Sequence, residues 1–295
     1  MTPWGDIQDA IAGATGASFA IESRTQVGGG CINQCYRVAG RARTFFVKLN
    51  SRDRRAMFEA EAAGLAGIAG TGTVRVPSPV CFGSNDDTAW LVLEHIDFGD
   101  ATTNSMARLG AQLAALHRVT DSHFGWAADN TIGATPQINT RSRDWSGFWR
   151  ERRLKFQLTL AAGNGAPKTL LEKGERLAQD FAALLDNLPV KPALLHGDLW
   201  GGNAGFDRAG APVLFDPAVY YGHREADLAM TELFGGFSAN FYAAYREAFP
   251  LDAGYAVRKQ LYNLYHVLNH FNLFGGGYAR QAETMTAKLL AEIAG

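Results

Sequence analysis

The feature of this sequence that most limits its fold is a change of pattern near residue 96. Before it, segments rich in β-branched and aromatic residues predict strands, at 18–27, 32–39, 43–49 and 88–98. After it, most periodic segments predict helices. We therefore expect an α+β fold of two lobes, with a small antiparallel-sheet N-terminal lobe and a larger, mostly helical C-terminal lobe. The lobes are predicted at residues 1–96 and 97–295.

The 3.6-residue periodicity of apolar side chains places the individual helices. They are expected at 3–13, 53–69, 104–119, 146–162, 168–187, 224–234, 238–248, 255–274 and 279–293. Only two short strands are expected among the later helices, near 193–195 and 212–215.

Composition excludes several classes of protein. Hydrophobic residues make up 47% of the chain, enough for a core, and the net charge of −1 gives no basic field for nucleic acid. The apolar runs are too short to span a bilayer, and the N-terminus lacks a leader pattern. Three cysteines form no disulfide framework. We therefore expect a cytoplasmic protein with no nucleic-acid or membrane partner.

The stretch "HGDLWGGNAGFD", followed by "VLFDPA", carries the clearest chemical pattern. Asp198 and Asn203 share a loop, and Asp216 ends an apolar strand. A β-hairpin between them would bring all three side chains together at one end of the hairpin. Amide and carboxylate oxygens suit Mg²⁺, and a further carboxylate off the metal could accept a hydroxyl proton. The alternative is a plain turn, because turns favour Asp, Asn and Gly.

A second pattern lies in the N-terminal segment "VGGGCINQCYRV…FFVKLN". Glycines between two strands let backbone N–H groups approach phosphates. Lys48 ends an apolar strand, and Glu61 lies on the apolar face of its predicted helix. Each would be costly to bury alone, so we expect a Lys48–Glu61 ion pair that holds the lysine toward a phosphate. An ordinary exposed ion pair and a plain glycine hairpin are the alternatives.

Three histidines have simpler interpretations. His117 lies late in its helix, where a cation is favoured. His266 and His270 are four residues apart on one helix face, a spacing that can bind metal, but the motif of zinc proteases is absent. A core or pocket-lining role is favoured for both.

Taken together, these motifs resemble the protein-kinase-like phosphotransferases. "HGDLWGGN" is similar to their catalytic loop, with Asp216 at the place of the metal-binding aspartate. The closer resemblance is to the fructosamine kinase (ketosamine-3-kinase) family, relatives of the aminoglycoside kinases. It is carried by "GGGCINQCYRV", "FFVKLN", "MFEAEAAGLAGI", "VRVPSPV", "LHGDLWGGN", "DPAVYYGHREADLAM" and "LYNLYHVLNHFNLFGGGY".

The resemblance implies roles for matching positions. Asp198 is expected to be the catalytic base, Asn203 and Asp216 to hold Mg²⁺, and Lys48 with Glu61 to contact the phosphates of ATP. The expected nucleotide-binding residues also include the glycine loop and the hinge: Gly28, Gly29, Gly30, Asn33, Glu94, His95 and Ile96. Asp227 is expected to brace the catalytic loop, and Trp200 and His270 to line a sugar pocket.

The predicted function is ATP- and Mg²⁺-dependent phosphorylation of a hydroxyl, O3, of ketoamines. The substrate is expected to be a small ketoamine or a protein-bound glycated lysine, and phosphorylation to serve deglycation repair. The alternatives are a kinase of the same fold for an aminoglycoside or an amino alcohol, and a binding module without activity. Retention of Lys48, Asp198, Asn203 and Asp216 argues against the binding module.

The sequence departs from the pattern of these families at two places, and one cysteine has a possible chemical role of its own. Gly201 stands where the family usually has serine, and "DPA" replaces the DFG of protein kinases, so a flipping Phe is not expected. Cys31 follows the three glycines, where an electropositive phosphate site would favour its thiolate. The hypothesis is a redox switch there, with the chain a monomer or a redox-linked dimer. A residue merely tolerated in a turn is the alternative.

Overall fold

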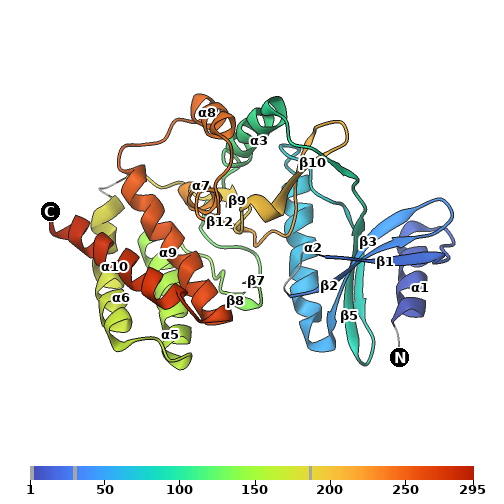
Figure 1. Cartoon of the computed structure of the whole chain (residues 1–295), viewed down its shortest axis with the longest axis horizontal. Helices are drawn as coiled ribbons and strands as arrows, with labels where there is room; N and C mark the ends of the chain where they lie inside the picture. The colour runs from blue at the N-terminus through green and yellow to red at the C-terminus, as the bar shows by residue number, and fades with distance from the viewer. Residues whose placement is uncertain (1–2, 29–31, 186–187) are drawn as a thin grey trace.

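A computed structural model describes residues 3–28, 32–185 and 188–295 and forms two lobes (Figure 1). The elements of the N-lobe are α1 (Trp4–Thr15), β1 (Ser23–Val27), β2 (Gln34–Ala39), β3 (Thr44–Ser51), α2 (Arg55–Ala69), β4 (Pro79–Ser84) and β5 (Thr88–Glu94). The division of the chain at residue 96 stays a prediction.

The N-lobe is a five-stranded antiparallel sheet with the strand order β1-β2-β3-β5-β4. Alternate side chains of a strand point to opposite faces. Val47 and Val92 therefore pack with Ile7 of α1 on one face. Leu91 and Leu93 belong to the core that includes Phe58 and Leu65 of α2 on the other face. The two helices thus cover the central strands from both sides.

The C-lobe follows the hinge and contains most of the helices (Figure 1). Its helices are α3 (Thr103–Leu116), α4 (Trp145–Trp149), α5 (Lys155–Gly163), α6 (Lys168–Asp180), α7 (Glu225–Thr231), α8 (Ala239–Ala248), α9 (Tyr255–Phe274) and α10 (Tyr278–Ala294). Its strands are β6 (Phe98–Gly99), β7 (Asn130–Ile132), β8 (Thr135–Gln137), β9 (Ala193–Leu195), β10 (Ala204–Asp207), β11 (Pro212–Leu214) and β12 (Tyr220–Gly222).

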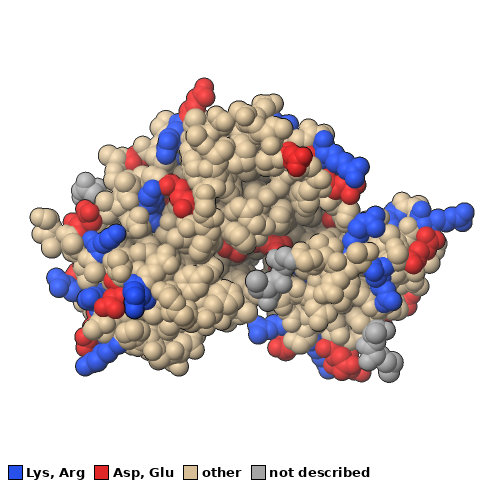
Figure 2. Space-filling view, viewed as in Figure 1, with Lys and Arg blue, Asp and Glu red and all other residues tan. Residues whose placement is uncertain are grey.

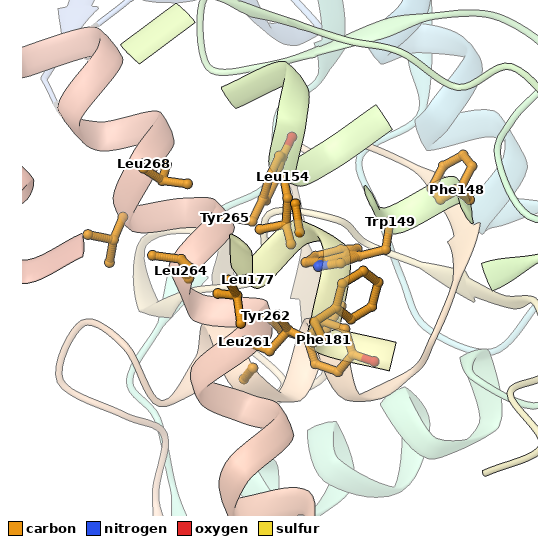
Figure 3. Packing of buried hydrophobic residues seen from close by; sticks show 14 of the residues in the cluster. Phe148, Trp149, Leu154, Leu177, Phe181, Leu261, Tyr262, Leu264, Tyr265 and Leu268 are labelled. Carbon is orange, nitrogen blue, oxygen red and sulfur yellow. The ribbon is translucent and has the colours of Figure 1, made fainter. Parts of the chain in front are cut away.

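The core of the C-lobe is built around α9, whose aromatic side chains meet those of α4 (Figure 3). The Trp149 and Tyr262 rings lie edge to face with centroids 4.9 Å apart, an arrangement that aromatic pairs prefer. Both side chains are fully buried. This packing fixes α9, which also supplies one wall of the cleft between the lobes.

The expectation of only two later strands was wrong. The structure also contains β6, β10, β12 and the hairpin β7–β8. The expected helix over 146–162 is interrupted, because Arg150–Leu154 form a π-helical segment between α4 and α5. Each missed strand is only two to four residues long, too short for alternation of apolar residues to mark it.

Candidate active site

The cleft between the lobes has a volume of about 460 Å³ and contains the polar residues that the sequence singled out. Figure 2 shows it as a hollow between the lobes with carboxylates visible on its floor. Lys48, Glu61, Asp198, Asn203 and Asp216 all line it, although they come from distant parts of the sequence.

The predicted Lys48–Glu61 ion pair is present. Lys48 Nζ lies 2.6 Å from Glu61 Oε1 on α2 and 2.5 Å from Asp216 Oδ1 in the C-lobe. Burial opposes the charged ammonium, but the two carboxylates outweigh it and raise the pKa of Lys48. The lysine therefore stays protonated and joins both lobes.

A hairpin places Asn203 beside Asp216, as the spacing predicted. Strands β10 and β11 pair antiparallel, and the Phe215 backbone N–H donates to the Asn203 carbonyl at 3.1 Å. Among the described residues, Asp216 alone of the non-glycine residues has a positive φ, 57°. Such strained backbone is retained where the surrounding structure imposes it, often at functional sites.

Asp198 lies in the loop before the hairpin, partly exposed to the cleft. Asn203 Nδ2 donates to the Asp198 carbonyl at 2.8 Å and to its Oδ2 at 3.3 Å, which orients the carboxylate. Burial, and then the charge of Asp216, raise the pKa of Asp198 to about 7. A carboxylate with a pKa near neutrality is suited to accept a proton and release it again.

Asp227 on α7 binds the backbone at the start of this loop. Its carboxylate accepts the backbone N–H groups of His196 at 2.7 Å and Gly197 at 2.8 Å. The His117 ring, 3.1 Å away, binds the same carboxylate, and both side chains are almost fully buried. His117 is therefore part of the buried support of the loop rather than an exposed group at a helix end.

Gly197 explains why the loop carries glycine between its histidine and aspartate. Its φ is +85°, and a Cβ there would lie 2.0 Å from the Ala218 carbonyl oxygen. Any side chain would force the loop away from the segment between β11 and β12 that carries Ala218. In contrast, a Cβ at Gly201 would meet nothing within 4 Å, so the departure from serine leaves open space.

The predicted nucleotide-binding residues are partly described. Gly28 is exposed, and the Asn33 side chain accepts a hydrogen bond from Asn50 at 2.8 Å, which anchors the end of the loop to β3. Gly29, Gly30 and Cys31 lie outside the described residues, and with them the redox hypothesis. Cys35 is buried, and burial raises the pKa of its thiol.

The hinge residues Glu94, His95 and Ile96 lie at the end of β5 and just after it. Arg75 bridges Glu94 and Asp207, with 2.6 Å contacts to each carboxylate. The Glu94 backbone N–H already donates to Ser78. This N–H is therefore not available to a ligand.

One side of the cleft is aromatic. The Phe234 ring lies 6.4 Å from that of Trp200 and 4.7 Å from that of His270. Tyr278 and Phe274 surround His270, at 5.2 and 5.6 Å. His270 Nδ1 lies 2.8 Å from the His266 carbonyl, so Nδ1 carries the proton and Nε2 is left as an acceptor.

Sequence reasoning missed a group of cleft residues. The hairpin β7–β8 contributes Asn130, Thr131, Ile132 and Gly133, and α9 contributes Asn269 and Leu273. His266 also lines the cleft, one of the two roles that the sequence favoured for it. The hairpin had a signal, because Gly133, with φ +62°, and Ala134 form a two-residue turn between Ile132 and Thr135.

Within the described residues, no helix is long and apolar enough to cross a membrane.

Comparison with known proteins identifies the family of the chain. The sequence profile of the fructosamine kinase family matches residues 3–292. A probable ketoamine kinase of Synechocystis is 50% identical over 98% of this chain and 97% of its own length. The chloroplastic protein-ribulosamine 3-kinase of Arabidopsis thaliana is 46% identical over 90% of this chain and 82% of its own.

Among solved structures, one assigned as a fructosamine-3-kinase from Haemophilus somnus superimposes with a TM-score of 0.89. It is 29% identical, and the match covers 97% of both chains. The sequence and the structure thus match the same family, and the chain belongs to the fructosamine kinase family.

Proposed function

We propose that this protein is an ATP-dependent ketoamine kinase that phosphorylates O3 of ribulosamine- or fructosamine-type glycation adducts. The observation that carries the proposal is the convergence of Lys48, Asp198 and Asp216 in one cleft with an aromatic wall, in a member of the fructosamine kinase family. Phosphorylation at O3 would make the adduct unstable and free the amine. The biological role is therefore deglycation.

Asp198 is the proposed catalytic base. Its carboxylate reaches into the cleft, is oriented by Asn203 and has a pKa near neutrality. A base of this kind accepts the proton of the substrate hydroxyl as the oxygen attacks the terminal phosphorus of ATP. The oxygen–phosphorus bond forms, the bond to the leaving ADP breaks, and the proton passes from Asp198 to solvent.

The donor set fits Mg²⁺. Asn203 uses its Nδ2 group toward Asp198, which leaves Oδ1, and Asp216 is half-exposed with one oxygen toward Lys48. Oxygen ligands in this small number are what Mg²⁺ takes when substrate phosphates and waters complete its shell. Asn203 and Asp216 would hold the ion, which, when bound, neutralises charge on the phosphates.

Lys48 is the proposed phosphate-binding cation, held in place by Glu61. The segment from Gly28 to Asn33, Gly29 and Gly30 included, is proposed to cover the phosphates with its backbone N–H groups. At the hinge, the bond of the Glu94 N–H to Ser78 leaves the backbone around His95 and Ile96 to receive adenine. The Glu94 side chain forms an ion pair with Arg75, so its proposed role is to stabilise the hinge rather than to contact the nucleotide.

The aromatic wall is the proposed acceptor site. Trp200, Phe234 and Tyr278 offer ring faces to the C–H groups of an open-chain sugar and to the protonated amine of a ketoamine. His270 Nε2 is positioned to accept a hydrogen bond from the same ligand.

An aminoglycoside is a weaker candidate. These antibiotics carry several ammonium groups and need several carboxylates. Among the described residues that line the cleft, the carboxylates are Glu61, Asp198 and Asp216, which the nucleotide and the chemistry already use. The aromatic wall favours a ligand with few charges.

The experiment is ATP consumption with ribulosyl-lysine, erythrulosyl-lysine, fructosyl-lysine, an aminoglycoside and choline. We expect the ketoamines to be consumed and an analogue without the O3 hydroxyl to be inert. If choline or the aminoglycoside outcompetes ribulosyl-lysine by about tenfold in kcat/KM, the proposal is wrong and another acceptor is the substrate.

A further inference from the structure

His266 lines the cleft between the lobes, and within the described residues its ring has no hydrogen-bond partner. It belongs to α9, on the C-lobe side of the cleft opposite the sheet of Lys48 (Figure 1). The side chain is only 4% exposed, yet it lines the cleft. Within the described part of the chain, its ring makes an edge contact with Tyr265 but no hydrogen bond.

The other two polar side chains of α9 that line the cleft, Asn269 and His270, already hydrogen bond within the fold through at least one atom. Asn269 Nδ2 donates to the Ile132 carbonyl, and its Oδ1 accepts from Gln157. His270 uses Nδ1 on the His266 carbonyl. His266 is thus the cleft-lining polar side chain of α9 with both hydrogen-bonding atoms still to be matched.

Because the ring lines the cleft and no group within the described residues hydrogen bonds to it, a ligand in the cleft can supply the missing partner. The chemistry of the ring narrows that ligand. Burial, and then the proximity of His270, lower the pKa of His266 to about 3, so the ring is neutral. A neutral imidazole has one donor and one acceptor, like a hydroxyl group, and does not suit a phosphate, which prefers a cation.

We propose that His266 recognises the sugar chain of the ketoamine by hydrogen bonding one of its hydroxyls, other than the reacting O3. The assignment rests on the proposed function and deepens it. It makes His266 a specificity-determining residue of the acceptor site, one turn below His270 on the same helix.

The experiment compares His266→Phe, which keeps the ring and removes both hydrogen-bonding atoms, with His266→Asn, which keeps a donor and an acceptor. With ribulosyl-lysine, His266→Phe should lower kcat/KM by roughly 5- to 100-fold, the range for an unmatched buried hydroxyl. His266→Asn should recover part of that loss. KM for ATP should stay near wild type, and the melting temperature of His266→Phe should be equal or higher.

Asn263→Leu is the matched control. Asn263 is similarly buried on α9, its Oδ1 has no partner in the described part of the chain, and it is not among the described residues that line the cleft. This variant should leave the kinetics of ribulosyl-lysine unchanged.

Analogues that each lack one hydroxyl give the decisive comparison. The loss caused by His266→Phe should disappear for one of them, the analogue without the hydroxyl that His266 binds. Two results would overturn the role of His266 and leave the proposed function intact. One is an equal loss of kcat/KM in His266→Phe with every analogue. The other is an active wild type whose kcat/KM for ribulosyl-lysine is unchanged by His266→Phe. A wild type that phosphorylates no ketoamine overturns the proposed function and this assignment together.

Discussion

Lys48 Nζ and Asp216 Oδ1 lie 2.5 Å apart across the cleft, so one ion pair joins the sheet of the N-lobe to the strand end of the C-lobe. The same ammonium lies 2.6 Å from Glu61 on α2. A single buried cation therefore links three elements whose relative positions define the cleft.

Replacing Lys48 with Met should leave Glu61 buried without its partner. Removing one member of a buried pair costs about 3 kcal/mol or more of the free energy of unfolding, because a charge is left uncompensated. The double variant Lys48→Met/Glu61→Gln should recover much of that stability and still fail to bind ATP tightly. Urea unfolding and nucleotide titration separate the two effects. A double variant less stable than Lys48→Met would contradict this account.

The Lys48–Glu61 pair could be predicted because local patterns placed both partners. A lysine at the end of an apolar strand and a glutamate on an apolar helix face each need a counter-charge. The hairpin between Asn203 and Asp216 was predictable for the same reason, since its spacing and its glycines are local. The long helices also followed from periodicity, and α9 has the predicted bounds.

Two of the missed strands depend on contacts between distant segments. Strand β12 exists because Tyr220 pairs with Leu195 of β9, and β6 exists because Gly99 pairs with Phe206. Such short strands carry no alternation of their own. The acceptor role proposed for His266 depends on which buried groups stay unpaired, and a sequence pattern does not give that.

Asp227→Asn should loosen the catalytic loop. The carboxylate accepts two backbone N–H groups and is 1% exposed, whereas an amide would turn its NH₂ group toward a donor. We expect a loss of about 2–4 kcal/mol in the free energy of unfolding. We also expect a lower kcat with little change in KM for ATP, because Asp198 is displaced. The control is Asp97→Asn, whose carboxylate is 57% exposed and should contribute little.

Asp216 should be tested with two replacements, because its backbone is left-handed. Asn tolerates positive φ and Ala does not, which costs about 1–2 kcal/mol. Both variants lose the carboxylate charge, so both should weaken Mg²⁺-dependent ATP binding at least tenfold, as measured by calorimetric titration with and without Mg²⁺. Both variants also remove a carboxylate partner of the buried Lys48, so Asp216→Ala should be the less stable of the two by the cost of its backbone strain. Wild-type affinity for Mg·ATP in both variants would place the metal elsewhere.

The pH dependence of activity should report Asp198. Its pKa is raised to about 7, chiefly by burial and then by Asp216, and only the ionised carboxylate can accept the hydroxyl proton. The kcat/KM for ribulosyl-lysine should therefore rise with pH and level off above about pH 7. A cation held at Asp216 opposes that charge, so the midpoint should lie at or below 7. A profile that is flat from about pH 5 to pH 9 would remove Asp198 as the base.

Asp198→Asn should be nearly inactive and yet more stable than the wild type at pH 8. Loss of the base should lower kcat by roughly 10²–10⁴, with ATP binding retained. The folded-state pKa of Asp198 is raised from 3.8 to about 7, so the unfolded chain loses this proton first as pH rises. Wild-type stability therefore falls across that window, by about 4 kcal/mol at most. The unfolding midpoints of the two proteins should coincide below pH 4 and diverge between pH 4 and pH 7. A difference that stays constant with pH would show that ionising the buried Asp198 does not destabilise the fold.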